Sequence, residues 1–152
     1  MIGIRVSGLS DVILELRNTG KLVRENARKT MHRGADKIVE RARLMAPVDE
    51  GNLEDAIQKD VKYEGKFGRL AIDIVLLDHV NGVDVSAYGR EMHEGVYNLG
   101  PKSEEKQKTT GVQVGREFIT RAYKEQAEKM QRQMVGTVED GIEGIVDNGG
   151  KE

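Results

Sequence analysis

The chain has 152 residues, which is enough for one domain with one hydrophobic core. It contains no cysteine, which excludes disulfides, thiolate nucleophiles and cysteine-ligated zinc or iron–sulfur sites. Lys and Arg number 24 against 26 Asp and Glu, so a net charge of −2 gives no general attraction to nucleic acid or membranes. No run of about 18 apolar residues is present, so we expect neither a signal peptide nor a membrane span, and a protein made and kept in a cytoplasm. We predict a single domain over residues 1–146 and a frayed tail over residues 147–152.

The first predicted elements are a short strand and a long helix. Residues 2–6 alternate in polarity, which is typical of an edge strand or an ordered arm. Ser10 and Asp11 offer an N-cap, and apolar residues then recur on one helical face up to Met45. Pro47 ends this pattern, because the residue before a proline is disfavoured in a helix. These signals predict one amphipathic helix from about residue 10 to residue 46, with a kink at residues 18–20.

The middle of the chain predicts a turn, a hairpin and a third strand. Residues 49–52 have turn composition, and residues 53–57 can form one helical turn. Two segments that alternate in polarity, 61–63 and 70–76, flank a connection containing glycine, which indicates a β-hairpin. The apolar run at 75–77 predicts burial on both faces of its strand end. After a polar turn, Val83, Val85 and Ala87 begin a predicted third strand that carries Tyr88.

The remaining segment predicts a loop and a second helix. Residues 102–110 contain no apolar side chain, so we predict a mobile loop over residues 98–112. A second amphipathic helix follows from Phe118 to Val138. Gly136, Gly141 and Gly144 should weaken its end, each by about 1 kcal/mol relative to alanine.

One stretch contains residue types that could support a metal site or acid–base chemistry. Its members are Asp78, His79, Asp84, Glu91, His93 and Glu94. Their spacing matches no known motif, and the adjacent His93 and Glu94 would face opposite sides of a strand. Phosphate-binding and nucleophile-elbow motifs are also absent from the sequence. We therefore expect no catalytic residue, cofactor or metal, interpret the group as a polar strand edge and turn, and keep an enzyme as the weakest alternative.

Charge is segregated along the chain. Between Arg17 and Met45 nine residues are basic and three acidic, whereas from Tyr123 onward four are basic and seven acidic. Four of the basic residues form a stripe on the predicted helix: Arg17, Lys21, Arg24 and Arg28. A solvated helix face is the commonest explanation of such a stripe. A contact surface between copies is the second, and nucleic-acid binding is a third, although no aromatic residues interleave with the stripe.

Three short motifs occur in the order found in one protein family. The first is Ala-Pro-Val-Asp-Glu-Gly-Asn-Leu at 46–53, in which Pro47 stops a helix and Gly51 permits a tight turn. The second runs from residue 88 to residue 95, and the third is Gly-Arg-Glu-Phe-Ile-Thr-Arg-Ala at 115–122. Through these motifs the chain resembles the HK97 gp10-like phage neck and tail-completion proteins over residues 10–135, with Glu50 in place of the usual threonine. The motif positions are Pro47, Gly51, Leu53, Ile57, Tyr88, Glu94, Gly95, Phe118 and Ala122.

The resemblance implies an α+β fold, with a long N-terminal helix and a C-terminal helix packed on a small, mainly antiparallel β-sheet. It implies a structural virion protein, assembled in the bacterial host cytoplasm, that forms a ring with itself in the neck of a tailed phage. Its partners would be head-completion (stopper or connector) and tail-tube or tail-terminator proteins, with passing DNA as a further contact and no membrane. The candidate interface is the basic stripe together with Lys102, Lys106 and Lys108 of the predicted loop. A small nucleic-acid-binding protein is the main alternative.

Overall fold

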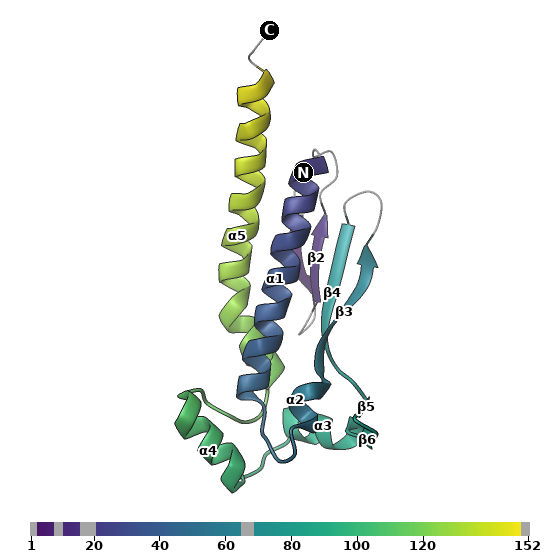
Figure 1. Cartoon of the computed structure of the whole chain (residues 1–152), viewed down its shortest axis with the longest axis vertical. Helices are drawn as coiled ribbons and strands as arrows, with labels where there is room; N and C mark the ends of the chain where they lie inside the picture. The colour runs from purple at the N-terminus through teal and green to yellow at the C-terminus, as the bar shows by residue number, and fades with distance from the viewer. Residues whose placement is uncertain (1–2, 8–10, 16–20, 65–68, 150–152) are drawn as a thin grey trace.

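The computed structural model contains two long helices beside a small sheet, with the shorter helices gathered at one end (Figure 1). The structure describes residues 3–7, 11–15, 21–64 and 69–149, and the side chains of residues 21–61 and 70–141. The helices are α1 (Lys21–Met45), α2 (Asn52–Ala56), α3 (Ser86–Glu94), α4 (Pro101–Thr110) and α5 (Phe118–Gly149). The strands are β1 (Gly3–Ser7), β2 (Asp11–Glu15), β3 (Ile57–Glu64), β4 (Arg69–Leu76), β5 (His79–Val80) and β6 (Val83–Asp84). The predicted α+β fold is confirmed.

The main sheet has four antiparallel strands in the order β1-β2-β4-β3. The predicted hairpin is therefore confirmed as β3 and β4, and the predicted strand at the start of the chain is confirmed as the edge strand β1. Alternate residues of β4, namely Leu70, Ile72 and Ile74, are buried in the same core as the apolar face of α1. This period-two burial places α1 along one face of the sheet.

The predicted start of the first helix is wrong. Residues 11–15 form β2, which pairs with β4 so that residues 12 and 14 stand opposite Ile72 and Leu70. The sequence Asp-Val-Ile-Leu-Glu fits either periodicity over such a short span, and backbone pairing with β4 decides in favour of a strand. The helix begins at Lys21, and the predicted kink at 18–20 lies outside the described residues.

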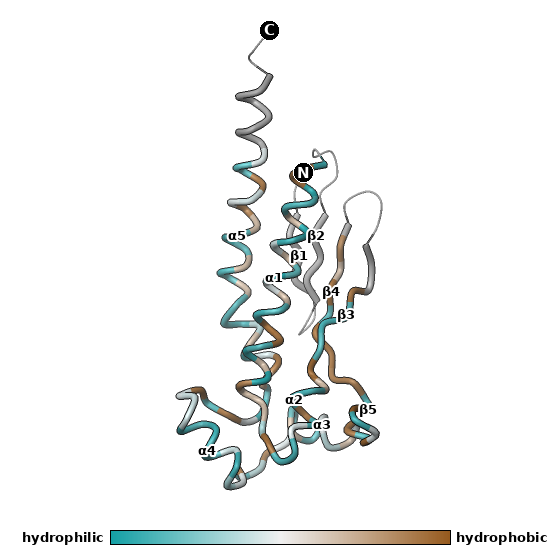
Figure 2. The backbone as a smooth tube through the Cα atoms, viewed as in Figure 1, coloured by the Kyte–Doolittle hydropathy of each residue, from teal (hydrophilic) through white to brown (hydrophobic). Residues whose placement is uncertain are grey.

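The long helices α1 and α5 pack side by side and antiparallel. Along α1 from its end to its start, Arg41 meets Glu125, Thr30 meets Thr137 and Val23 meets Gly141. Both helices are amphipathic: apolar and polar residues alternate along each of them (Figure 2), and their buried apolar residues belong to one core. A Cβ on Gly34 would lie 2.3 Å from the sulfur of Met130, and one on Gly141 would lie 2.4 Å from Cγ2 of Val23. The two glycines therefore set how closely the helices approach.

The predicted third strand is also wrong. Residues 79–84 form a short β5–β6 hairpin whose turn residues, Asn81 and Gly82, have φ of 53° and 78°. Tyr88 lies on helix α3, where the Asp84 carboxylate accepts hydrogen bonds from the backbone N–H and the hydroxyl of Ser86 at 3.0 and 2.6 Å. The predicted burial of residues 75–77 on both faces is not seen, since Leu77 is 36% exposed.

The predicted loop at 98–112 contains a helix instead. Residues 101–110 form α4, which begins with Pro101 at its first turn and ends at Gly111 in the left-handed conformation. Ser103 is its one buried residue, and the helix is largely hydrophilic (Figure 2). Helix α5 continues past its glycines to Gly149, so the predicted frayed tail is helical from Asp147 to there. Residues 150–152 lie outside the described residues.

The glycines of α5 allow a test of the helix contact. Gly136→Ala should stabilise the protein by about 0.5–1 kcal/mol, because nothing lies within 4 Å of the added methyl group and alanine favours the helix. Gly141→Ala should instead lower the unfolding free energy, because the methyl group meets the stiff β-branched side chain of Val23. Chemical denaturation of both variants measures the difference. Val23→Ala should cost less in the Gly141→Ala background than alone, and equal stabilisation by both alanines would contradict the close packing.

Candidate interaction surface

The turn between α1 and β3, residues 46–57, is held by side chains from several elements. Helix α1 ends before the buried Pro47, and Gly51 adopts φ of 86°, in the left-handed region that favours glycine. The Arg43 guanidinium donates two hydrogen bonds, of 3.2 and 2.9 Å, to the carbonyl of Ile57. Leu53 and Ile57 of the motif are buried. The turn is thus fixed at both of its ends.

Lys106 of α4 caps the end of α1. Its ammonium donates to the carbonyls of Arg43 at 2.5 Å and Ala46 at 2.9 Å, and it forms an ion pair with Glu54. A cation at these carbonyls is favourable because the C-terminal end of a helix carries partial negative charge. The Lys106 side chain is only 13% exposed, so we remove it from the predicted interface.

Two further residues of α4 bind the tip of the same turn. The Ser103 hydroxyl accepts a hydrogen bond from the N–H of Val48 at 2.9 Å and lies 3.2 Å from its carbonyl. Lys102 donates to the carbonyl of Asp49 at 2.7 Å. Helix α4 is therefore attached by polar contacts, which explains why its sequence needs no apolar face. Pro101 at the start and Gly111 at the end were the local signals for a helix here.

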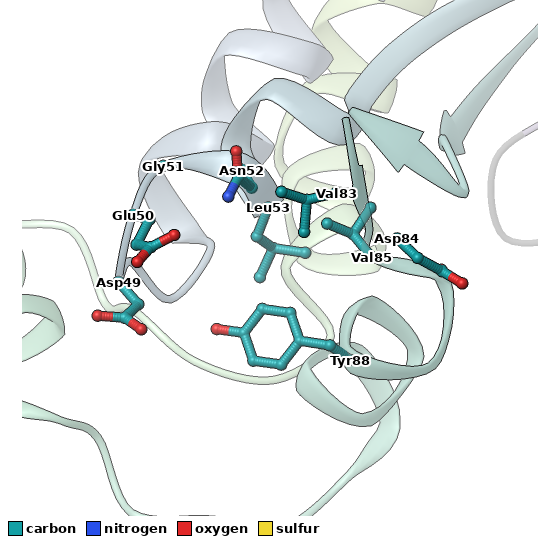
Figure 3. A pocket seen from close by; sticks show the side chains of 9 residues that line it. All are labelled: Asp49, Glu50, Gly51, Asn52, Leu53, Val83, Asp84, Val85 and Tyr88. Atoms are coloured by element: carbon teal, nitrogen blue, oxygen red, sulfur yellow. The ribbon is translucent and has the colours of Figure 1, made fainter. Parts of the chain in front are cut away.

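The turn, the β5–β6 hairpin and α3 form an open groove (Figure 3). Its apolar floor is formed by Leu53, Val83, Val85 and Tyr88, and its rim carries Asp49, Glu50 and Asp84; we call it the acidic groove. Tyr88 and Val83 are 40% and 42% exposed, which makes them large apolar side chains in contact with solvent. The Tyr88 hydroxyl is directed toward the side of the groove where Asp49 and Glu50 lie.

Two pKa values in the groove are shifted. Burial, and secondarily the charge of Asp49, raises the pKa of Tyr88, so its hydroxyl stays protonated at neutral pH and is a donor. Hydrogen bonds from Ser86 lower the pKa of the Asp84 carboxyl, which stays ionised. The groove therefore presents a protonated tyrosine hydroxyl on the side of Asp49 and Glu50, with the ionised Asp84 on the opposite side.

Most of the other motif residues lie at a joint between α3 and the start of α5. The ring of His93 meets Phe118 edge-on, with centroids 4.9 Å apart at 83°, and the His93 carbonyl accepts from the N–H of Glu117 at 2.7 Å. Phe118 and Ala122 are fully buried. Gly95 ends α3 where a Cβ would lie 2.5 Å from the Glu91 carbonyl, whereas Glu94 is exposed. The joint connects α3 to the start of α5.

The candidates for metal or acid–base chemistry do not converge on one centre. His79 lies 3.8 Å from Asp84 on the β5–β6 hairpin, whereas Asp78, His93 and Glu94 line a separate pocket in which the His93 ring packs against Phe118 of α5. Within the described part of the chain, no group of three His, Asp or Glu residues could hold a metal ion. The sequence did not predict four residues with structural roles. Three of them, Arg43, Ser103 and Lys106, hold the turn, and the fourth is Arg121, whose guanidinium donates to three carbonyls of residues 113–116.

The predicted basic stripe is not one open surface. Arg17 lies outside the described residues, and Lys21 is exposed with Glu25 at 3.9 Å. Arg24 and Arg28 are half-buried, and each already interacts with another group of the protein. Lys102 and Lys108 are exposed on α4. The other exposed cations of α1, Lys29, Arg33 and Lys37, lie on a different side of the helix.

The comparisons with known proteins support the resemblance over part of the chain. Residues 10–75 match the family described as bacteriophage HK97-gp10, putative tail-component. The match covers β2, α1, the turn and the β3–β4 hairpin, and it confirms the resemblance there. The segments containing Tyr88 and Phe118 lie beyond it, so their place in the family pattern stays a prediction. No curated protein and no solved structure matches the chain.

None of the helices in the described part of the chain combines the length and the apolarity needed to cross a membrane.

Lys106→Met should lower the unfolding free energy by about 1–3 kcal/mol, because the carbonyls of Arg43 and Ala46 and the Glu54 carboxylate lose their cation. Lys108→Met is the matched control on the exposed side of α4 and should change stability by less than about 0.5 kcal/mol. Thermal and urea unfolding measure both. Equal effects of the two substitutions would contradict the capping role.

Stability should fall as the pH falls through the ordinary histidine pKa of about 6.5. Burial lowers the pKa of His93, against the opposing effects of Glu94 and Glu117, so the unfolded chain binds a proton that the folded chain excludes. His93→Phe, which keeps a ring against Phe118, should reduce the loss of unfolding free energy between pH 7.5 and pH 5.5. His79→Gln, at an exposed histidine, should keep the full loss, and the reverse pattern would contradict the assignment.

Proposed function

We propose that this protein is a structural virion protein of a tailed bacteriophage that forms a ring in the neck and joins or completes the tail. The observation that carries the proposal is the match of residues 10–75 to a family of putative phage tail components. Head-completion and tail-tube or tail-terminator proteins would be its neighbours, and the virion its location.

The arrangement of the motifs supports this assignment. The turn at 46–57, the Tyr88–Gly95 segment and the Gly115–Ala122 segment are far apart in sequence but lie at the same end of the molecule (Figure 1). There they hold one another, since the N–H of Gly115 donates to the Met45 carbonyl at 2.9 Å and Glu117 binds His93. A mechanical part needs such a fixed end to present its contact residues in one geometry.

A ring requires two different faces on each copy. In a closed ring of identical subunits, one face of each subunit must complement another face of its neighbour. The described surface offers distinct candidates, because the acidic groove lies at one end and cations line the exposed side of α1. The predicted lysines Lys102 and Lys108 stay candidates for contact with the adjoining ring or tail tube.

The proposal is tested in phage and in solution. A nonsense mutation in the gene should yield separate heads and tails, or tails whose ends are not completed. Supplying the intact chain from a plasmid should restore joined particles. The purified protein, or the protein released from particles, should form a closed oligomer in native mass spectrometry and in micrographs. Joined, infectious particles that lack the protein would refute the proposal.

Nucleic-acid binding is the second candidate, favoured by the exposed Lys29, Arg33 and Lys37 of α1. If these cations neutralise phosphates, binding to duplex DNA should weaken steeply between low and moderate salt and disappear in the triple charge-reversed variant. A neck protein that uses them for protein contact should show weak DNA binding and lose ring incorporation instead.

A further inference from the structure

The acidic groove is a preorganised surface. Its tip, Asp49–Glu50, stands on the turn that Lys106, Ser103 and Arg43 hold in place. The carboxylate of Asp49 is 77% exposed and that of Asp84 is 62% exposed, and they flank the exposed ring of Tyr88. Lys102, 3.4 Å from Asp49, and His79, 3.8 Å from Asp84, are the basic groups beside them. A groove with an aromatic floor and an acidic rim suits a partner that brings cations next to an apolar side chain.

The exposed side of α1 carries the complementary chemistry. Lys29, Arg33 and Lys37 follow one another at intervals of four residues, which places them along one side of the helix. All three are exposed, and no described residue forms an ion pair or hydrogen bond with any of them. Leu44, two turns beyond Lys37, is 38% exposed and continues the same side. We call these four residues the basic face.

Acidic residues near the basic face are mostly engaged elsewhere. Glu25 lies 3.9 Å from Lys21, and Asp36 pairs with Lys59 of β3 at 2.7 Å. Glu40 is the remaining exposed carboxylate on this side of α1. The basic face therefore keeps a positive excess, whereas other cations near it, such as Arg41 with Glu125 at 2.6 Å, are neutralised within the protein.

We propose that the basic face of one copy docks into the acidic groove of a second copy. This inference rests on the proposed ring and names the two faces that would close it. The cations of the basic face meet Asp49 and Glu50, while Leu44 packs on Tyr88 and Val83. Because the two faces are different parts of the chain, the contact is heterologous, as a ring requires. Opposite charges steer the encounter and fix its register, and the apolar centre excludes water.

The first experiment reverses the charge of one face at a time. The groove variant is Asp49→Lys with Glu50→Lys, which leaves Lys102 its hydrogen bond to the Asp49 backbone carbonyl. The helix variant is Arg33→Glu with Lys37→Glu. Each should weaken self-association at least about tenfold and be monomeric where the wild-type chain is oligomeric. Glu139→Lys with Asp140→Lys, two adjacent exposed carboxylates on α5, is the control and should assemble normally.

Mixing the two monomeric variants gives the decisive result. Each variant keeps one intact face, and the two reversed faces are opposite in charge, so a heterologous contact predicts that the mixture regains assembly, with the two variants alternating in the oligomers seen by native mass spectrometry. Assembly of the single variants at wild-type strength, or a mixture that stays monomeric, would overturn the inference. Circular dichroism and thermal unfolding establish that both variants are folded before the comparison.

Cross-linking in phage particles separates this inference from the proposed function. The chain has no cysteine, so Leu44→Cys with Val83→Cys leaves all charges intact and places one thiol on each face. A short bis-maleimide should then link copies into a ladder longer than dimers. Val135→Cys with Val83→Cys, at an equally exposed valine of α5, should give no such ladder. If the protein is present in joined particles but the variant Leu44→Cys with Val83→Cys gives no ladder, the docking is wrong and the structural role stands. If particles join without the protein, the proposed function itself fails.

Discussion

The antiparallel contact between α1 and α5 positions the other elements of the fold. It buries one face of each helix in a single core, and Gly34 and Gly141 let the two helices approach where a side chain would separate them. Besides α5, the buried face of α1 also contacts β3 and β4 of the sheet. Because α1 is shared by both layers, the position of its last turn sets where the sheet begins and where the connecting segments must meet.

The end of α1 shows how a polar segment can be ordered without an apolar core of its own. Unpaired carbonyls at a helix end need partners, and Lys106 satisfies two of them while neutralising Glu54. Ser103 and Lys102 extend the attachment to the next residues of the turn. The energy of these contacts comes from satisfying buried backbone groups, so the helix that supplies them has no need of apolar residues. The consequence is a turn whose tip, Asp49 and Glu50, is presented to solvent in a fixed position.

Some basic side chains of this protein pair with carboxylates of the same chain, and others face solvent. Arg41, Lys59 and Lys106 pair with carboxylates of the same chain, whereas Lys29, Arg33 and Lys37 face solvent without a described partner. Like charges four residues apart on an exposed helix destabilise it by only about 0.2–0.5 kcal/mol per pair, so this uncompensated row costs the monomer little. The attraction between this row and the carboxylates of a second surface is stronger where an apolar centre excludes water. The groove around Tyr88 has the exposed aromatic ring and the carboxylates for that role.

Local sequence patterns predicted the body of α1 and its stop before Pro47, the turn at Gly51, the β3–β4 hairpin, and α5, but not the start of α1. These follow from local spacing, which a single segment carries within itself. The tertiary structure decided β2, α3 and α4, and with them the groove. Residues 11–15 form a strand because their backbone pairs with β4. Helix α4 is held in place by hydrogen bonds from its side chains to backbone carbonyls more than fifty residues away, such as that of Lys106 to Ala46. Tyr88 met Asp49 and Leu53 only through those contacts, because no local pattern encodes which distant segment a side chain will touch.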